Sequence, residues 1–147
     1  MVRIVTLLVM YLVSQLINAQ TTFVREHTYV DEVVLIKVSV SNVATMEGSV
    51  KFALYTEEGF LTKPLQAKIG EINERFATVT FAEVPEGEYA IVCFHDKNAN
   101  NQMDFSEKGI PIEDYGSTNN IYRMGPPTFE DAKFTVKNKS LDLEIKF

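Results

Sequence analysis

The sequence of 147 residues contains one cysteine and two histidines, and both scarcities limit what the chain can do. The single cysteine, Cys93, excludes an intramolecular disulfide, so stability must come from packing, with or without a bound metal. Cys93 falls within an apolar stretch, which favours a buried and inert thiol over a reactive one. His27 and His95 stand in no metal-protease or nucleophile-elbow motif.

Positive charge is also in the minority. Lys and Arg number 14 against 20 for Asp and Glu, which gives a formal net charge of −6. Nucleic acids and anionic membranes reward clustered Lys and Arg, so we expect neither as a partner. Metal ions and other cationic partners fit an acidic chain better.

The first nineteen residues carry the three regions of a secretory signal. Arg3 precedes an apolar run over residues 4–13, and a more polar stretch leads to Ala19. An uncleaved anchor is the less favoured alternative, because Ser14 interrupts the run and a membrane span needs about 20 apolar residues. No cysteine stands at the cleavage position to accept a lipid. We therefore expect a signal peptide cleaved after Ala19 and an exported protein, periplasmic or secreted, without membrane insertion.

Residues 20–31 are assigned to an N-terminal extension and residues 32–147 to one β-domain. Strands are predicted where apolar and polar residues alternate or where β-branched and aromatic residues dominate. Residues 88–95 are apolar on both faces, as expected of a central strand covered on each side. The remaining predicted strands are residues 32–42, 49–56, 66–69, 76–84, 132–137 and 140–147. The last two are separated by Asn138-Lys139 and are predicted to form a closing hairpin.

These segments predict an all-β fold, an antiparallel immunoglobulin-like or transthyretin-like sandwich of about seven strands. A small closed barrel is the alternative. The junction Val84-Pro85-Glu86-Gly87-Glu88-Tyr89 is similar to the corner of such sandwiches, in which a tyrosine hydroxyl bonds to nearby backbone. Tyr89 is therefore expected to be structural.

Residues 96–127 show no strand pattern, and so long an irregular stretch is uncommon in a compact domain unless it has a function. The stretch opens with Asp96-Lys97-Asn98-Ala99-Asn100-Asn101-Gln102-Met103-Asp104-Phe105-Ser106-Glu107. Oxygen-bearing side chains occupy positions 1, 3, 5, 9 and 12 of this loop, and position 7 can offer its backbone carbonyl. This is the ligand pattern of the twelve-residue calcium loop. The predicted calcium ligands are Asp96, Asn98, Asn100, Gln102, Asp104 and Glu107.

The loop departs from the calcium pattern at position 6, where glycine is usual and Asn101 stands. Asparagine is the next most tolerant residue of the left-handed backbone that this position needs. A strand precedes the loop and no amphipathic helix leaves it, so the predicted ion is structural and not a switch. The alternative interpretation is that Asp and Asn are favoured here only as turn formers. Magnesium is less favoured than calcium because it demands a more regular cage.

Three ordered motifs lie between residues 89 and 132. They are Tyr89-Ala90-Ile91 followed by His95-Asp96-x-Asn98-x-Asn100, then Gly109-Ile110-Pro111-x-Glu113-x-Tyr115-Gly116-Ser117, and finally Gly125-Pro126-Pro127-x-Phe129-x-x-Ala132. In these motifs the chain resembles an uncharacterised family of exported bacterial proteins, domain of unknown function 2141, from about residue 49 to residue 147. That family usually has glycine in place of Asn101, and Thr118 interrupts its usual run from Ser117 to the asparagines. The resemblance implies an architecture and no known activity.

Two classes of function remain open. The first is a non-enzymatic binding or structural module, stabilised by calcium, with residues 110–129 as the contact surface for an unknown protein or carbohydrate ligand. Aromatic side chains of this region could stack on a sugar or peptide, or pack into the core. They are Phe105, Tyr115, Tyr122 and Phe129.

The second class is a secreted hydrolase that uses His95 and Ser117 with Asp114 or Glu113. Nucleophilic catalysis needs a base within hydrogen-bond reach of the hydroxyl and a third group that orients the base. No spacing in the sequence supports such an arrangement, so the binding module is preferred.

Overall fold

The computed structural model describes residues 33–147. The predicted signal peptide, residues 1–19, and the predicted extension, residues 20–31, lie outside the described residues. Within residues 33–147, no helix has both the length and the apolar character needed to cross a membrane.

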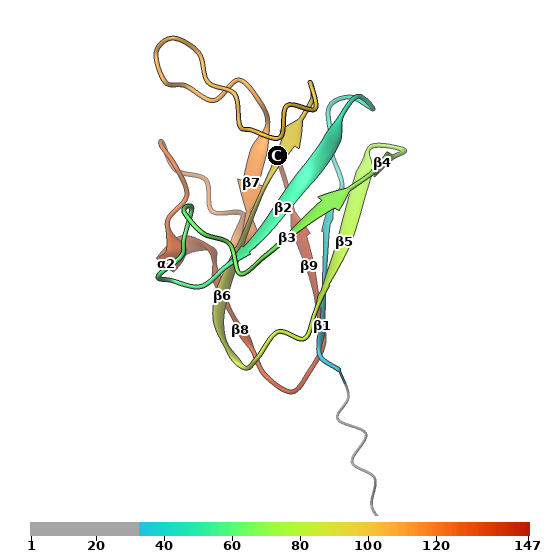
Figure 1. Ribbon diagram of the computed structural model, residues 1–147, viewed down its shortest axis with the longest axis vertical. Helices are drawn as coiled ribbons and strands as arrows, with labels where there is room; N and C mark the ends of the chain where they lie inside the picture. The colour runs from blue at the N-terminus through green and yellow to red at the C-terminus, as the bar shows by residue number, and fades with distance from the viewer. Residues whose placement is uncertain (1–32) are drawn as a thin grey trace, which may run out of the picture. The chain divides into compact units, whose positions relative to one another are not determined.

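The described chain folds into nine strands and two short helical turns (Figure 1). The strands are β1 (Leu35–Val40), β2 (Ser49–Tyr55), β3 (Gln66–Gly70), β4 (Ile72–Asn73), β5 (Phe76–Ala82), β6 (Gly87–Asp96), β7 (Tyr115–Ser117), β8 (Lys133–Val136) and β9 (Leu141–Ile145). The helical turns are η1 (Thr118–Asn120) and α2 (Phe129–Ala132). The predicted all-β class is confirmed, and β4 and β7 are short strands that the sequence pattern did not reveal.

The strands form two open sheets, which is a sandwich-like arrangement and not a closed barrel. One sheet has four strands in the order β4-β5-β1-β9. The other has five, in the order β3-β2-β6-β7, with β8 also paired to β6. Along one edge of β6, Gly87 to Ala90 pair with β8 and Val92 to Phe94 pair with β7. All pairs are antiparallel except β1 with β9, which is parallel.

The core lies between the two sheets and follows from the period-2 alternation of the strands. In β1 the inward Ile36, Val38 and Val40 are fully buried, and their partners in β5 include Phe81. The facing sheet contributes alternate residues of β2 and β6, among them Phe52. Full burial of an aliphatic or aromatic side chain stabilises the fold by about 1.5–3 kcal/mol, so these strands hold the two sheets together.

The predicted closing hairpin of residues 132–137 and 140–147 is wrong. The structure places β8 against β6 and β9 against β1, so the two strands belong to different sheets. Between them, the turn at Asn138 carries the chain across the edge of the sandwich and keeps only an isolated bridge from Lys137 to Lys139. Alternation shows which face of a strand is buried but not which strand it pairs with, and that is why the pattern suggested a hairpin.

The predicted corner at Tyr89 is present only in part. Gly87 has an extended φ of 158°, and a methyl group added to it would lie 3.2 Å from the Tyr89 ring. The ring is buried in the core, but within the described chain its hydroxyl makes no hydrogen bond to backbone. Tyr89 therefore supports the start of β6 by packing.

We predict that iodoacetamide leaves Cys93 unmodified in the folded protein and modifies it in denaturant. The side chain is fully buried, and this burial raises the pKa of the thiol, which removes the reactive thiolate. Intact mass before and after unfolding measures the difference. Equal labelling rates in the two conditions would contradict the buried position of Cys93.

Candidate functional site

The candidate site begins at Asp96, the last residue of β6. Its side chain is fully buried, and its two oxygens accept hydrogen bonds from the backbone N–H groups of Asn100 (3.1 Å) and Asn101 (3.0 Å). The ammonium of Lys51, on β2, lies 3.4 Å from the same carboxylate and donates to the Asn101 amide oxygen at 2.7 Å. A buried carboxylate requires such partners, so Asp96 forces the chain to curl around it at the end of the strand.

Two asparagines continue the curl. The amide oxygen of Asn98 accepts from the backbone N–H of Asn100 at 3.1 Å, and that of Asn100 accepts from the N–H of Gln102 at 2.8 Å. Ala99 and Asn101 both have left-handed backbone, with φ of 58° and 64°. The left-handed geometry expected at Asn101 is confirmed, and the alternate side chains of the loop turn inward as a result.

Asp104 closes the inner side of the loop. Its carboxylate accepts hydrogen bonds from the amide nitrogens of Asn98 (2.6 Å) and Asn100 (2.9 Å). The structure thus brings together four of the predicted ligand residues, from positions 1, 3, 5 and 9 of the loop. Gln102, at position 7, is exposed at the turn.

Glu107 lies apart from this cluster. Residues 105–111 form a small projecting hairpin in which Phe105 bridges Pro111 and Ser106 bonds to Ile110 (Figure 1). Glu107 is in its exposed tip and makes no hydrogen bond or ion pair with a described residue. Its role as a ligand therefore stays a prediction.

Sequence reasoning missed Glu113 as part of this loop. Its side chain is almost fully buried, and its two oxygens accept from the backbone N–H groups of Lys97 (2.9 Å) and Asp104 (3.1 Å). The residue lies outside the twelve-residue window of the calcium pattern, although it belongs to the second of the three sequence motifs. Only the folding back of the chain brings its carboxylate to the loop.

No three His, Cys, Asp or Glu side chains within residues 33–147 come together in a group that could hold a metal ion. The oxygens that line the inner side of the loop come instead from carboxylates and amides together.

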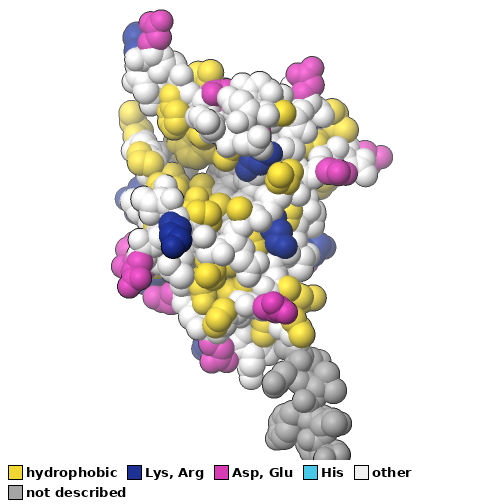
Figure 2. Space-filling view, in the orientation of Figure 1, with side chains coloured by type: hydrophobic (Ala, Val, Ile, Leu, Met, Phe, Trp, Pro, Cys, Tyr) yellow, Lys and Arg dark blue, Asp and Glu magenta, His cyan; other side chains and the backbone are white. Residues whose placement is uncertain are grey.

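An apolar groove of about 1150 Å³ adjoins the loop, and Asn101 and Met103 belong to both. Its floor is the outer face of the five-stranded sheet, with Val92 and Phe94 of β6. Figure 2 shows hydrophobic side chains on both sides of a hollow in this face of the molecule. The groove is thus the place where irregular segments meet the sheet.

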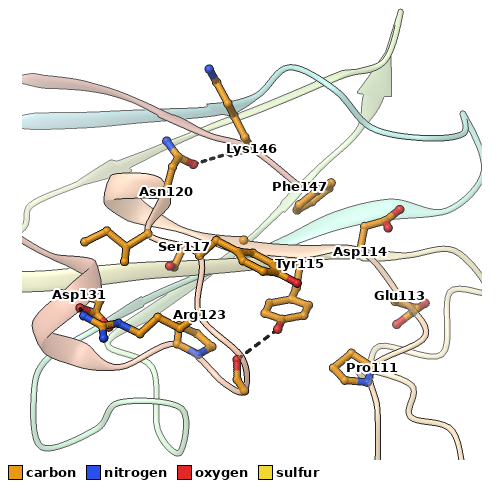
Figure 3. Close-up of a pocket in the computed structure, with 15 residues that line it drawn as sticks. Pro111, Glu113, Asp114, Tyr115, Ser117, Asn120, Arg123, Asp131, Lys146 and Phe147 are labelled. Atoms are coloured by element: carbon orange, nitrogen blue, oxygen red, sulfur yellow. Dashed lines mark hydrogen bonds and ion pairs between the residues drawn. The ribbon is translucent and has the colours of Figure 1, made fainter.

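A smaller cavity of about 460 Å³ shares Pro111, Tyr115 and Arg123 with the groove and has a more polar lining (Figure 3). In it, the Tyr115 hydroxyl donates to the Gly125 carbonyl at 3.3 Å. Arg123 donates to Asp131 at 2.7 Å, and this guanidinium lowers the pKa of the Asp131 carboxyl. Both contacts hold the loop over residues 122–127 against the domain.

The turn η1 ties this segment to both sheets. Thr118 is buried and its hydroxyl bonds to the backbone of Ile91 and Ala132. Asn119 donates to the carbonyls of Asp131 and Lys133, and Asn120 contacts the backbone of Glu144 and Lys146 in β9 and beyond. These polar side chains satisfy backbone groups, so their role is structural.

Comparison with known proteins adds the family. Residues 38–144 match the family described as an uncharacterized protein conserved in bacteria (DUF2141). The chain belongs to the DUF2141 family. No curated protein and no solved structure matches it.

Nothing in the DUF2141 family or in the described residues points to catalysis. His95 is buried in the core, where its Nε2 lies 2.7 Å from the Glu47 carbonyl oxygen. No described residue partners its Nδ1. Ser117 is paired with Val92 in the sheet, and no hydrogen bond joins it to His95 in the part of the chain that the structure describes.

The four aromatic side chains proposed for the contact surface of this DUF2141 protein have different environments. Phe129 is buried beside Ala90 in a small second core under α2. Tyr115 is half-buried, whereas Phe105 and Tyr122 are exposed. Packing accounts for Phe129, and the other three line the apolar groove.

Gly48 controls how closely β2 approaches the base of the loop. Its φ is +71°, and a methyl group added there would lie 1.9 Å from the Asp96 carbonyl oxygen. We predict that Gly48→Ala lowers the free energy of unfolding by about 1–3 kcal/mol, measured by urea denaturation. Gly109→Ala is the matched control, because φ is +73° and nothing lies within 4 Å. Equal losses in both variants would mean that the left-handed backbone alone, and not contact with Asp96, sets the cost.

Proposed function

We propose that this DUF2141 protein is an exported, non-enzymatic binding module. In this module a calcium-stabilised loop braces residues 110–129, which form the ligand surface. The observation that carries the proposal is the arrangement of residues 96–104. The oxygens of Asp96, Asn98 and Asn100 each accept a backbone N–H of the same loop, and the Asp104 carboxylate accepts the side-chain amides of Asn98 and Asn100. Ca²⁺ takes six to eight hard oxygens in irregular geometry, and this is the donor type that the loop presents.

The hydrogen bonds within the loop are compatible with ion binding. An amide oxygen has two lone pairs and a carboxylate about four acceptor sites, so each can accept a backbone N–H and still ligate a cation. Asp104 now accepts from the amide nitrogens of Asn98 and Asn100, and a cation between these groups would take the place of those two bonds. The ion would add positive charge beside the Asp96 carboxylate, whose cationic neighbour is Lys51.

We further propose that Glu113 supplies the closing carboxylate in place of Glu107. Its buried position against Lys97 and Asp104 supports this, as does the position of Glu107 in the exposed tip of the 105–111 hairpin. A loop closed by Glu113 would join the end of β6 to the start of the proposed contact surface, residues 110–129. Because no helix pair within residues 33–147 adjoins the loop, the ion would act as a fixed brace rather than as a switch.

The two packed sheets also support assigning the sandwich to the immunoglobulin-like or transthyretin-like type. In such folds, loops at the ends of the strands carry binding surfaces. The segment after β6 has this position here.

Calcium should bind with a dissociation constant of about 10⁻⁴ to 10⁻³ M and raise the melting temperature, and chelator should reverse the rise. We expect Glu113→Gln to weaken binding by about tenfold or more, because it removes a ligand charge, and Glu107→Gln to weaken it by less than about twofold. Calorimetry and thermal denaturation of both variants test this. If Glu107→Gln weakens binding more than Glu113→Gln does, Glu107 is the closing ligand. If calcium produces no binding heat and no thermal stabilisation in the native protein, the calcium site is ruled out.

Export is tested separately. Expressed from Met1 in a bacterial host, the protein should accumulate outside the cytoplasm with Gln20 as its first residue, because residues 1–19 match a cleaved signal. Intact mass and N-terminal sequencing of the fractions measure this. A full-length chain that stays in the cytoplasm would contradict export.

A further inference from the structure

The cavity of about 460 Å³ beside β7 lies within the size range of small-molecule sites, which is about 300–1,000 Å³. Residues 111–127 supply most of its lining, so it belongs to the segment proposed above as the ligand surface. Figure 3 shows the Arg123–Asp131 pair at one end of this hollow and Asp114 at the other. Glu113, the proposed closing ligand of the calcium loop, stands next to Asp114 in the lining. A ligand in the cavity would therefore touch the part of the segment that the loop braces.

The charged groups at the two ends of the cavity already have partners. The Asp131 carboxylate takes Nε and Nη2 of Arg123. The Asp114 carboxylate lies 3.1 Å from the ammonium of Lys97. Lys146 also contributes to the lining, but its side chain points away from the other labelled residues in Figure 3. A further charge placed in the cavity would lose water without gaining a free counter-charge, so a neutral ligand suits this site better than an anion or a cation.

Several polar atoms of the lining keep hydrogen-bonding capacity that the described chain does not use. Ser117 is only 7% exposed, and its hydroxyl makes no hydrogen bond with another residue in the range 33–147. Nη1 of Arg123 keeps two donors and Oδ1 of Asp114 keeps its acceptor sites, since neither atom has a partner among the described residues. A nearly buried hydroxyl without a protein partner requires water or a ligand. Donors and acceptors are thus both open to one ligand.

An exposed aromatic ring completes the lining. Tyr122 is 91% exposed and borders the cavity together with Tyr115, whose hydroxyl already bonds to the Gly125 carbonyl. The face of an aromatic ring carries partial negative charge and attracts weakly positive C–H groups, while a tyrosine hydroxyl can also form a hydrogen bond. Tyr122 therefore offers an apolar face and a polar tip to the same ligand.

A saccharide meets these conditions together. It is neutral, each of its hydroxyls both donates and accepts, and its ring presents C–H groups to an aromatic face. An alkyl chain would leave the open polar atoms without partners. An extended peptide is recognised through the backbone of a strand edge, and β7, the strand that lines the cavity, has only three residues.

We propose that the cavity binds a neutral saccharide of one or two rings, with a C–H face on Tyr122 and hydroxyls at Ser117 and Asp114. The free Nη1 of Arg123 donates to a further hydroxyl. This assignment rests on the proposed function and deepens it, since it names the ligand class of residues 110–129. Calcium in the loop would fix Glu113 and, through it, the wall that carries Asp114.

The test is calorimetric titration of the protein, expressed as the full chain and recovered after any processing by its host, with a panel of neutral disaccharides. The panel is cellobiose, maltose, lactose, mannobiose and N,N′-diacetylchitobiose. At least one should bind with a dissociation constant of about 10⁻³ M or lower. The amino-sugar and uronic-acid counterparts of the best binder should bind about fivefold more weakly, because the charges of the cavity are already paired.

A matched pair of variants locates the binding. Tyr122 and Met124 lie on the same loop and are 91% and 99% exposed, and both line the apolar groove, but only Tyr122 lines the cavity. Tyr122→Ala should weaken the best binder by about tenfold or more, because it removes the aromatic face, and Met124→Ala should leave the affinity within about twofold.

Ser117→Ala separates a ligand contact from a structural role. Because the Ser117 hydroxyl makes no hydrogen bond with a described residue, its removal should weaken the saccharide by about fivefold or more and leave the melting temperature unchanged. A lowered melting temperature with unchanged affinity would contradict the contact at Ser117.

Three results would overturn the saccharide assignment: no binding by any member of the panel, tighter binding of a charged counterpart, or equal losses in Tyr122→Ala and Met124→Ala. The calcium measurements are independent of these titrations. Thermal stabilisation by calcium without saccharide binding would contradict only the ligand class, and saccharide binding without a calcium effect would contradict only the brace. Cleavage of the bound disaccharide would contradict the non-enzymatic role and leave the ligand class standing.

Discussion

Strand β6 is the constraint on which the rest of the structure depends. It pairs with β2 on one edge and with β8 and then β7 on the other. Both of its faces are apolar, so both need cover. The opposite sheet buries the inner face. On the outer face, α2 covers the end near Ala90 and the irregular segment meets the end near Phe94. The groove therefore follows from the need to cover a central strand with short, irregular pieces of chain.

The polar side chains of residues 96–127 satisfy the hydrogen-bonding needs of backbone groups that no regular strand or helix pairs. Asp96 and Glu113 are both buried carboxylates, and each accepts two backbone N–H groups of the loop. The turn η1 does the same for carbonyls of α2, β8 and β9 through Asn119 and Asn120. Side chains thus replace the regular hydrogen bonds that a segment without helix or strand lacks. This accounts for the fixed course of a long segment that has little secondary structure.

The proposed calcium loop and the groove share residues, so order in the loop bears directly on the groove wall. Lys51 bonds to both Asp96 and Asn101 on the sheet face, and Met103 continues from the loop into the groove wall. A cation held among the loop oxygens would stiffen that wall without a large movement, because the strand that leads into the loop is fixed on both edges. The same chain segment would then supply stability and recognition, as loops on rigid sandwiches commonly do.

The sequence alone determined the all-β class, most of the strands and the inward curl of residues 96–104, because period-2 alternation and the turn preferences of Asp and Asn are local properties. It also identified Asn101 as a residue able to adopt the left-handed backbone that the structure has there. Only the tertiary structure decided the pairing of β8 with β6 and β9 with β1, because alternation does not encode a partner. It also brought Glu113 to the loop and left Glu107 in solvent. That exchange depends on how a distant stretch folds back against β6, and no spacing within a twelve-residue window carries this information.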